Sequence, residues 1–169
     1  MKITAALSYG ADTPFEIAEV ELDEPRADEV LVALTAAGVC HTDLTVRARW
    51  PVERSPIVLG HEGAGVVVAV GAAVSRVRPG DRVLMSYRSC EACPECAAGH
   101  APYCLAFAAL NTSGSRPDGS TTMARDGVPV HGSFFGQSSF ASHALAYESN
   151  LVVVGDDVDL GVAAPLGCG

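Results

Sequence analysis

Four of the six cysteines in this chain of 169 residues lie in one short segment. Cys90, Cys93 and Cys96 are separated by two residues each, and Cys104 follows after seven more. Four thiolates so close together can complete a tetrahedral zinc site, which leaves no open position for a substrate. An iron–sulfur cluster is the alternative, because the same spacing suits cubane clusters. We interpret the cysteines as a structural zinc site that stabilises a polar lobe at about residues 86–106.

The remaining cysteines, Cys40 and Cys168, lie far from this segment, and His61 lies between them. A single cysteine after a strand is more often a small core residue than a ligand. The residues that follow His61 change that interpretation. They form an ordered glycine pattern: Gly60-His61-Glu62-Gly63-Ala64-Gly65, then Gly71 and Val74.

This pattern resembles the signature of zinc-containing alcohol dehydrogenases, members of the medium-chain dehydrogenase/reductase family. Other ordered matches extend over nearly the whole chain: Gly38 to Asp43, the four-cysteine lobe, Ser133 to Ala141, and Pro165 to Gly169. Cys40 to Asp43 and Phe134 to Ala141 look most like the aryl-alcohol (benzyl alcohol) dehydrogenase branch. The resemblance implies a mainly β fold with short helices: a GroES-like β-barrel catalytic domain over residues 1–169 with a zinc-binding lobe.

The resemblance also implies a catalytic zinc site. Cys40, His61 and Cys168 match its three protein ligands, and the fourth position stays open for water or alcohol. Zinc lowers the pKa of an alcohol that binds it. The resemblance then implies that the substrate is a primary alcohol, aromatic or not. Its alkoxide would transfer a hydride to NAD or NADP and leave an aldehyde.

Four further residues match catalytic or cofactor-binding positions of the family. Thr42 matches a hydroxyl that hydrogen-bonds the alcohol, with a helix cap as the alternative interpretation. Asp43 matches a carboxylate that holds the imidazole of His61 in its metal-binding tautomer. Glu62 matches a carboxylate behind the zinc that approaches the metal during ligand exchange, with a solvated loop acid as the alternative. His41 matches a contact to the cofactor pyrophosphate.

The chain departs from the family at the end of the proton relay. Some members carry a histidine three residues after the hydroxyl, and here that position is Thr45. Trp50 lies in the segment that lines the substrate pocket of the family, although a single tryptophan is more often part of a core. Three histidines match no family motif, and we interpret them as structural or exposed: His100, His131 and His143.

The elements that must position these residues are short. Seventeen glycines and ten prolines separate runs of Val, Ala and Leu, which indicates strands and turns more than long helices. The predicted strands cover residues 3–7, 15–22, 30–37, 64–70, 82–85, 140–146 and 151–154. We expect the first third of the chain to form antiparallel sheet.

Two short helices and a hairpin complete the predicted elements. Thr42 or Asp43 would cap a helix from Leu44 to Arg49 that stops at Pro51. The hairpin is expected between two turns, Asp118-Gly119 and Asp126-Gly127. Acidic residues 156–159 would open a second helix. That helix is expected to bury three apolar side chains: Leu160, Val162 and Ala163.

Composition excludes several classes of partner. The formal net charge of −9 has the wrong sign for binding a phosphate backbone, so nucleic acid is not expected as a partner. The N-terminus lacks a secretory signal, and no apolar run reaches the roughly 18 residues of a membrane span. We therefore predict a cytoplasmic protein that does not bind membranes and keeps its thiols reduced.

A Rossmann fingerprint, G-x-G-x-x-G between a strand and a helix, is not found in the sequence. The nearest match begins at Gly63 but has Val68 in place of the third glycine. Because family members continue from the last cysteine into the nucleotide-binding half, we expect a fragment that cannot oxidise alcohol alone. The whole enzyme is expected to be a homo-oligomer, a dimer or tetramer.

Two alternatives to an alcohol dehydrogenase share these motifs. One is a non-catalytic, zinc-stabilised GroES-like domain that serves as a binding or scaffold module. The other is a zinc-dependent aldehyde reductase or formaldehyde-conjugate dehydrogenase, which differs only in substrate or direction.

Overall fold

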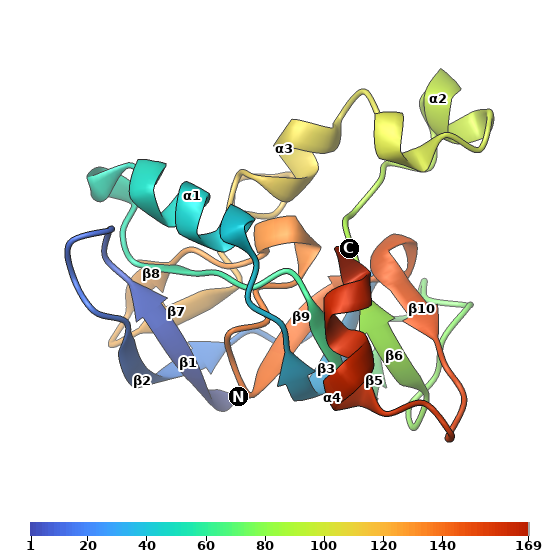
Figure 1. The fold of residues 1–169 in the computed structure, drawn as a ribbon, viewed down its shortest axis with the longest axis horizontal. Coiled ribbons are helices and arrows are strands. Elements are labelled where there is room, and N and C mark those ends of the chain that lie inside the picture. Colours follow the sequence, from blue (N-terminus) through green and yellow to red (C-terminus); the bar gives the residue numbers. More distant parts are fainter. Residues whose placement is uncertain (169) are drawn as a thin grey trace.

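Two antiparallel sheets of five strands form the body of the domain in the computed structural model, which describes residues 1–168 (Figure 1). The strands of the first sheet are, in spatial order, β4 (Ile57–Val58), β1 (Lys2–Ser8), β2 (Glu16–Leu22), β7 (Met123–Arg125) and β8 (Val128–Val130). Those of the second are β10 (Leu151–Val153), β6 (Arg82–Met85), β5 (Gly63–Val70), β3 (Glu29–Ala37) and β9 (His143–Tyr147). The prediction of a mainly β domain is confirmed.

The helices are short and lie outside the sheets (Figure 1). They are α1 (His41–Arg49), α2 (Pro94–Ala97), α3 (Phe107–Asn111) and α4 (Leu160–Ala163), with single 3-10 turns between other elements. The segment that carries α2 projects from the body at one end. None of the helices in residues 1–168 has both the length and the apolar character needed to cross a bilayer.

The first third of the chain forms antiparallel sheet, as predicted, but its strands belong to two different sheets. β1 and β2 pair in the first sheet, whereas β3 pairs with β5 and β9 in the second. Val30, Leu31 and Val32 of β3 are all buried, and because successive side chains point to opposite faces, this central strand is covered on both faces. A strand's partners are set by this tertiary burial and not by its own sequence.

The chain just before β9 joins the two sheets. The predicted strand at residues 140–146 begins only at His143. Before it, the amide of Ala6 donates to the Phe140 carbonyl at 2.8 Å, and the amide of Ser142 donates to the Thr4 carbonyl at 2.8 Å. This short stretch therefore pairs with β1, and its continuation pairs with β3.

The predicted hairpin exists, but Asp126-Gly127 closes it and does not flank it. β7 and β8 meet across this turn, where Asp126 has φ 51° and Gly127 has φ 78°. Positive φ at both residues is the requirement of a type I′ turn, for which Asp-Gly is a preferred pair. Asp118-Gly119 lies in a separate turn, whose Gly119 amide donates to the Arg116 carbonyl.

The last helix is shorter than predicted and buries one side chain fewer. The Asp159 carboxylate caps α4 by accepting hydrogen bonds from the amides of Gly161 and Val162. Leu160 and Ala163 are buried as predicted, but Val162 is 77% exposed. A four-residue helix on the surface presents only one face to the body, and residues three apart share that face.

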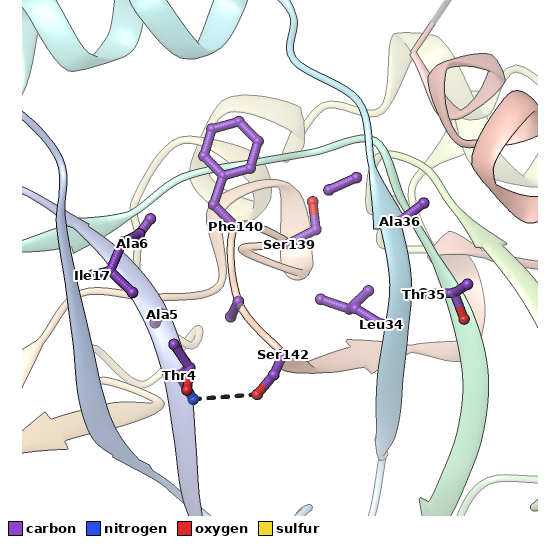
Figure 2. Close-up of a pocket in the computed structure, with 12 residues that line it drawn as sticks. Thr4, Ala5, Ala6, Ile17, Leu34, Thr35, Ala36, Ser139, Phe140 and Ser142 are labelled. Carbon is purple, nitrogen blue, oxygen red and sulfur yellow. Dashed lines mark hydrogen bonds between the residues drawn. The ribbon is translucent and has the colours of Figure 1, made fainter.

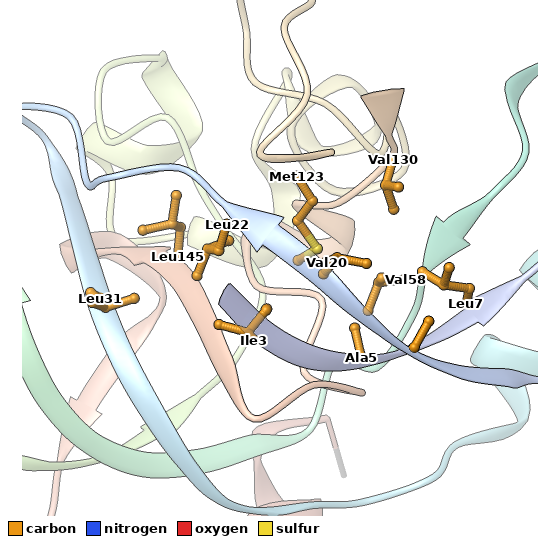
Figure 3. Packing of buried hydrophobic residues seen from close by; sticks show 11 residues of the cluster. Ile3, Ala5, Leu7, Val20, Leu22, Leu31, Val58, Met123, Val130 and Leu145 are labelled. Carbon is orange, nitrogen blue, oxygen red and sulfur yellow. The ribbon is translucent and has the colours of Figure 1, made fainter. Parts of the chain in front are cut away.

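The main core lies between the sheets (Figure 3). Most of its members come from the first sheet, and Leu31 and Leu145 come from the second. The cluster is Ile3, Ala5, Leu7, Ala18, Val20, Leu22, Leu31, Val58, Met123, Val130 and Leu145. A second cluster, rich in valine, packs within the second sheet around Val67 and Met85. These two clusters supply the apolar burial that holds the strands together.

A buried ion pair fixes the connection between α3 and β7 to the second sheet. Arg116 donates to both carboxylate oxygens of Glu29, at 2.7 and 3.1 Å, and to Asp23 at 2.7 Å. The Tyr147 hydroxyl donates to Glu29 at 3.1 Å. Arg116 and Glu29 side chains are each 1% exposed. Burial alone would raise the pKa of Glu29, but the hydrogen bonds from Arg116 lower it below its ordinary value.

Candidate metal centres and active site

Helix α1 begins at a cysteine. Cys40 is its N-cap, and its sulfur accepts the backbone amide of Thr42 at 3.5 Å. The carboxylate of Asp43 accepts the Cys40 amide at 3.0 Å, which completes a capping box. The prediction that Thr42 or Asp43 caps this helix was therefore wrong, because the helix starts earlier, at His41. Trp50 ends it just before Pro51.

Asp43 connects the segment of Cys40 to the segment of His61. One carboxylate oxygen accepts the amide of Gly60 and lies 3.0 Å from His61 Nδ1, and the other accepts the Cys40 amide. Asp43 and His61 are each 1% exposed. Burial alone would lower the pKa of His61, but the bond to Asp43 raises it. This bond places the proton on Nδ1 and leaves the lone pair of Nε2 for a cation.

The atoms of the predicted catalytic ligands converge. The sulfurs of Cys40 and Cys168 lie 3.9 Å apart, and His61 Nε2 lies 3.2 Å from the Cys168 sulfur. Two sulfurs at about 2.3 Å from one tetrahedral zinc are about 3.8 Å apart, and a nitrogen and a sulfur about 3.6 Å apart. The donor set thus fits a zinc ion, with borderline-soft sulfur and imidazole ligands.

The two thiols of this set differ in acidity. The backbone amide of Thr42 donates to the Cys40 sulfur and lowers the pKa of that thiol. Burial, together with the neighbouring Cys40, raises the pKa of Cys168 to about 11. Near neutral pH the second thiol therefore ionises only when a cation binds beside it.

The glycine before Cys168 brings that ligand against the second sheet. A Cβ at Gly167 would lie 2.1 Å from the Met85 carbonyl, so no larger residue fits there. The Ser86 hydroxyl donates to the Gly167 carbonyl at 2.6 Å. Gly169, the final residue of the closing motif, lies outside the described residues.

The remaining predicted residues surround this set. A carboxylate oxygen of Glu62 lies within 4.8 Å of the three ligand atoms, and the side chain is 6% exposed, so it is not a solvated loop acid. The Thr42 hydroxyl lies 3.6 Å from the Cys40 sulfur. His41 is exposed on the first turn of α1, with its Nδ1 3.3 Å from the Thr45 hydroxyl.

Two aromatic residues that the sequence analysis did not single out pack on His61. The ring of Phe135 lies 4.6 Å from the imidazole at a tilt of 32°, and the ring of Phe134 lies 5.6 Å away, edge to face. Phe135 has φ 52°, and Ser133 and Ser138 also have positive φ. Such conformations are costly for residues other than glycine and are found at functional sites. The only sequence signal was the resemblance of this segment to the family.

The four-cysteine cluster forms a second centre. The sulfurs of Cys90, Cys93, Cys96 and Cys104 all lie within 4.8 Å of one another, and Cys90 and Cys96 are 3.9 Å apart. Amides of Cys96 and Leu105 lower the pKa of Cys93 to about 6, whereas desolvation and neighbouring thiols raise the pKa of Cys96 to about 12. The spacing of the sulfurs fits one tetrahedral ion with no open position.

His100, His131 and Trp50 are not part of either proposed ligand set and make contacts of their own. His100 is exposed and lies 3.3 Å from Glu95. His131 packs edge to face on Trp50 at 5.5 Å, and the Trp50 indole donates to the Arg54 carbonyl. Trp50 belongs to a cluster with Ile57, Leu59 and Phe134. These contacts describe structural roles for the histidine and the tryptophan.

An apolar groove of about 410 Å³ lies where the two sheets meet (Figure 2). Thr4 to Ala6, Leu34 to Ala37 and Ser139 to Ser142 line most of it. Phe140, which lines the groove, packs against the loop before His61, since a Cβ at Gly60 would lie 2.6 Å from the Phe140 ring. None of the predicted ligands lines this groove.

The fold and the two ligand sets define a GroES-like domain of the metal-dependent dehydrogenase class. The chain belongs to the alcohol dehydrogenase GroES-like domain family, whose model matches residues 26–156. It is 49% identical over 166 residues to a geraniol dehydrogenase of Castellaniella defragrans, covering 98% of this chain and 44% of that protein.

Solved structures agree with this assignment. An alcohol dehydrogenase zinc-binding domain protein from Burkholderia ambifaria superposes with a TM-score of 0.96 at 48% identity, over 100% of this chain and 46% of that one. Benzyl alcohol dehydrogenase from Acinetobacter calcoaceticus gives 0.91 at 42% identity, over 100% and 45%. The chain therefore spans less than half the length of these relatives.

Replacing Asp43 with asparagine is expected to weaken zinc binding at the Cys40, His61 and Cys168 set by about 10- to 100-fold. Asparagine keeps the size of the side chain but loses one acceptor oxygen, so either the Cys40 amide or the His61 Nδ1–H loses its partner. Competition with a zinc chelator measures the change. Unchanged zinc affinity would contradict the role given to Asp43.

Proposed function

We propose that this chain is the zinc-bearing catalytic domain of an NAD(P)-linked alcohol dehydrogenase that oxidises a primary alcohol to an aldehyde. Cys40, His61 and Cys168 would hold the catalytic zinc, and the four cysteines of the lobe a structural zinc. The observation that carries the proposal is the convergence of two thiols and an imidazole, with the buried Asp43 behind the imidazole. Glu62 offers a fourth potential ligand atom within 4.8 Å of the others, and the proposal requires it to leave that position to the alcohol.

Each residue of the site has a proposed task. When bound, zinc supplies a Lewis acid that lowers the pKa of an alcohol hydroxyl. Asp43 holds the His61 ring and the Cys40 backbone in place. The Thr42 hydroxyl would accept a hydrogen bond from the alcohol and pass its own proton on toward water as the alkoxide forms. Glu62 stands close enough to contact the metal while ligands exchange. His41, exposed beside them, would contact the cofactor pyrophosphate.

The aromatic ring beside His61, that of Phe135, favours an apolar substrate. The half-buried ring of Phe135 lies 4.6 Å from the His61 imidazole, so an apolar surface borders the ligand set. Geraniol and benzyl alcohol, named in two of the relatives, both carry a primary hydroxyl on a large apolar body. We propose an alcohol of this kind as the substrate.

Further elements of the proposal concern the whole protein. The relatives are about twice as long as this chain, so a nucleotide-binding domain outside residues 1–169 would hold NAD or NADP. All six cysteines are free thiols, which suits metal ligands in the reducing cytoplasm. A homo-oligomer is proposed as the assembled form.

Zinc content and alcohol oxidation of the whole protein test the proposal together. We expect two zinc ions per chain and alcohol-dependent reduction of NAD⁺ or NADP⁺, faster with benzyl alcohol or geraniol than with ethanol. One zinc ion confined to the four cysteines, with no alcohol-dependent reduction, would instead support the non-catalytic scaffold.

A further inference from the structure

A buried amide behind the catalytic ligands makes three hydrogen bonds to backbone groups from two segments. Gln137 is 1% exposed. Its oxygen accepts the Gly63 amide at 3.0 Å, and its nitrogen donates to the carbonyls of His61 and Ser86, each at 2.9 Å. One donor and two acceptors surround the group, so only this orientation of the amide satisfies all three.

Two of these bonds hold the backbone around His61. Gln137 holds the carbonyl of His61 and the amide of Gly63, the backbone groups on either side of Glu62. No side chain fits at Gly63, where a Cβ would lie 2.9 Å from the Gln137 oxygen and 2.8 Å from the Met85 sulfur. The backbone of the loop is therefore held on one side by Gln137, while Asp43 holds the His61 ring on the other.

The bond to Ser86 reaches the third metal ligand. Ser86 follows β6 directly, and its hydroxyl donates to the carbonyl of Gly167, the residue before Cys168. Its carbonyl accepts the Gln137 amide. Two hydrogen bonds through one residue thus connect Gln137 to the segment that carries Cys168. The two ligands lie 107 positions apart in the sequence, and these bonds join their segments.

We propose that Gln137 is a positioning residue of the catalytic metal site, setting the separation of His61 and Cys168 through their backbone and through Ser86. This inference rests on the proposed function, because it assumes a metal ion at those ligands. Gln137 touches neither the substrate nor the metal. It fixes ligand geometry in the way that groups behind metal ligands do, where their loss costs about 10- to 100-fold in metal affinity.

The test uses the zinc-loaded whole protein with Gln137→Met and Ser86→Ala. The first variant keeps the volume of the side chain and removes all three bonds, and the second removes only the bond to Gly167. The rate of zinc transfer to a chromogenic chelator is measured for both centres of each variant. Spectra of the cobalt-substituted protein report the geometry of the Cys40, His61 and Cys168 set.

A matched control is available in Asn111→Leu. Asn111 is also fully buried, and its amide accepts one backbone N–H, that of Arg88, and donates to two carbonyls, those of Arg88 and Phe107. It has the same bonding pattern as Gln137, but its hydrogen bonds reach Phe107 and Arg88, two residues before Cys90 of the four-cysteine lobe, and not a segment with a proposed catalytic ligand. If the loss of any buried amide speeds zinc release, both substitutions should do so equally. If Gln137 positions the ligands, only Gln137→Met should speed release from the Cys40, His61 and Cys168 set.

We expect zinc release from the catalytic set to be about 10- to 100-fold faster in Gln137→Met, with a smaller increase in Ser86→Ala and none in Asn111→Leu. The cobalt spectrum should change in the first two variants only. Release rates and spectra equal to wild type in both variants, or equal acceleration at both metal centres, would overturn the inference. If the wild-type protein binds metal only at the four cysteines, the proposed function fails and this inference fails with it.

Discussion

Alcohol-dependent reduction of NAD⁺ or NADP⁺ is expected to fall by about 1,000-fold when Cys40 is replaced with serine in the whole protein. A zinc Lewis acid contributes several kcal/mol to the transition state, and each 1.4 kcal/mol or so corresponds to a tenfold change in rate. Serine is a good helix N-cap, so α1 should persist. Its hydroxyl does not ionise at neutral pH and is a poor zinc ligand, so the loss should come from the metal site.

The measurement combines steady-state rates with zinc content. Cys40→Ser should hold one zinc ion instead of two. The control, Cys96→Ser, makes the same atomic change in the four-cysteine lobe and should lose the other ion while the catalytic set stays loaded. Wild-type activity in Cys40→Ser would disprove the assignment of Cys40 as a catalytic ligand.

Replacing Arg116 with methionine is expected to lower the free energy of unfolding by about 3–5 kcal/mol, the usual cost of breaking a buried ion pair. Glu29 then keeps a buried charge whose main partner is gone, with only the Tyr147 hydroxyl and the Arg26 amide as donors. Chemical denaturation at neutral pH measures the change. The segment that connects α3 to β7 should also lose protection from hydrogen exchange.

Two controls distinguish the loss of the ion pair from the effects of the single substitutions. Glu29→Gln combined with Arg116→Met should be less destabilising than the sum of the single changes, because no unpaired charge remains. Lys2→Met breaks an exposed pair with Glu19 and should leave stability almost unchanged. Additive effects of the first two changes would show that the pair is not coupled.

The pair also predicts a dependence on pH. Hydrogen bonds from Arg116 lower the pKa of Glu29 in the folded protein. The resulting stability is therefore fully present above the carboxyl's ordinary pKa, and it is lost as the pH falls through the lowered value. Wild type should lose stability over this acidic range more steeply than Arg116→Met.

The proposed metal ligands could be selected from sequence because their chemistry constrains them locally or through a motif. A tetrahedral four-thiolate site needs closely spaced cysteines, and a 14-residue separation from Cys90 to Cys104 is short enough to see directly. Cys40, His61 and Cys168 needed the family resemblance. Most strands were also predictable, since glycine and proline mark their ends and side-chain alternation marks their faces.

The features that sequence did not predict depend on tertiary packing. The sheet to which β3 belongs follows from burial on both faces, and the exposure of Val162 from the single face that α4 presents. Cys40 caps α1 because its sulfur and the Asp43 carboxylate meet the first amides, a role for which sequence preferences favour Ser, Thr, Asn or Asp. The positions of Gln137 and Phe135 depend on a loop with unusual φ values, which sequence patterns do not specify.

The start of α1 at Cys40 also bears on how this chain can change during evolution. The position satisfies two demands at once, a helix cap and a thiolate, and serine meets only the first. A single-base change at such a codon would leave a folded domain without its chemistry. A lineage that no longer needed catalysis could therefore keep this architecture intact, and related domains with serine here would be expected to survive as binding modules.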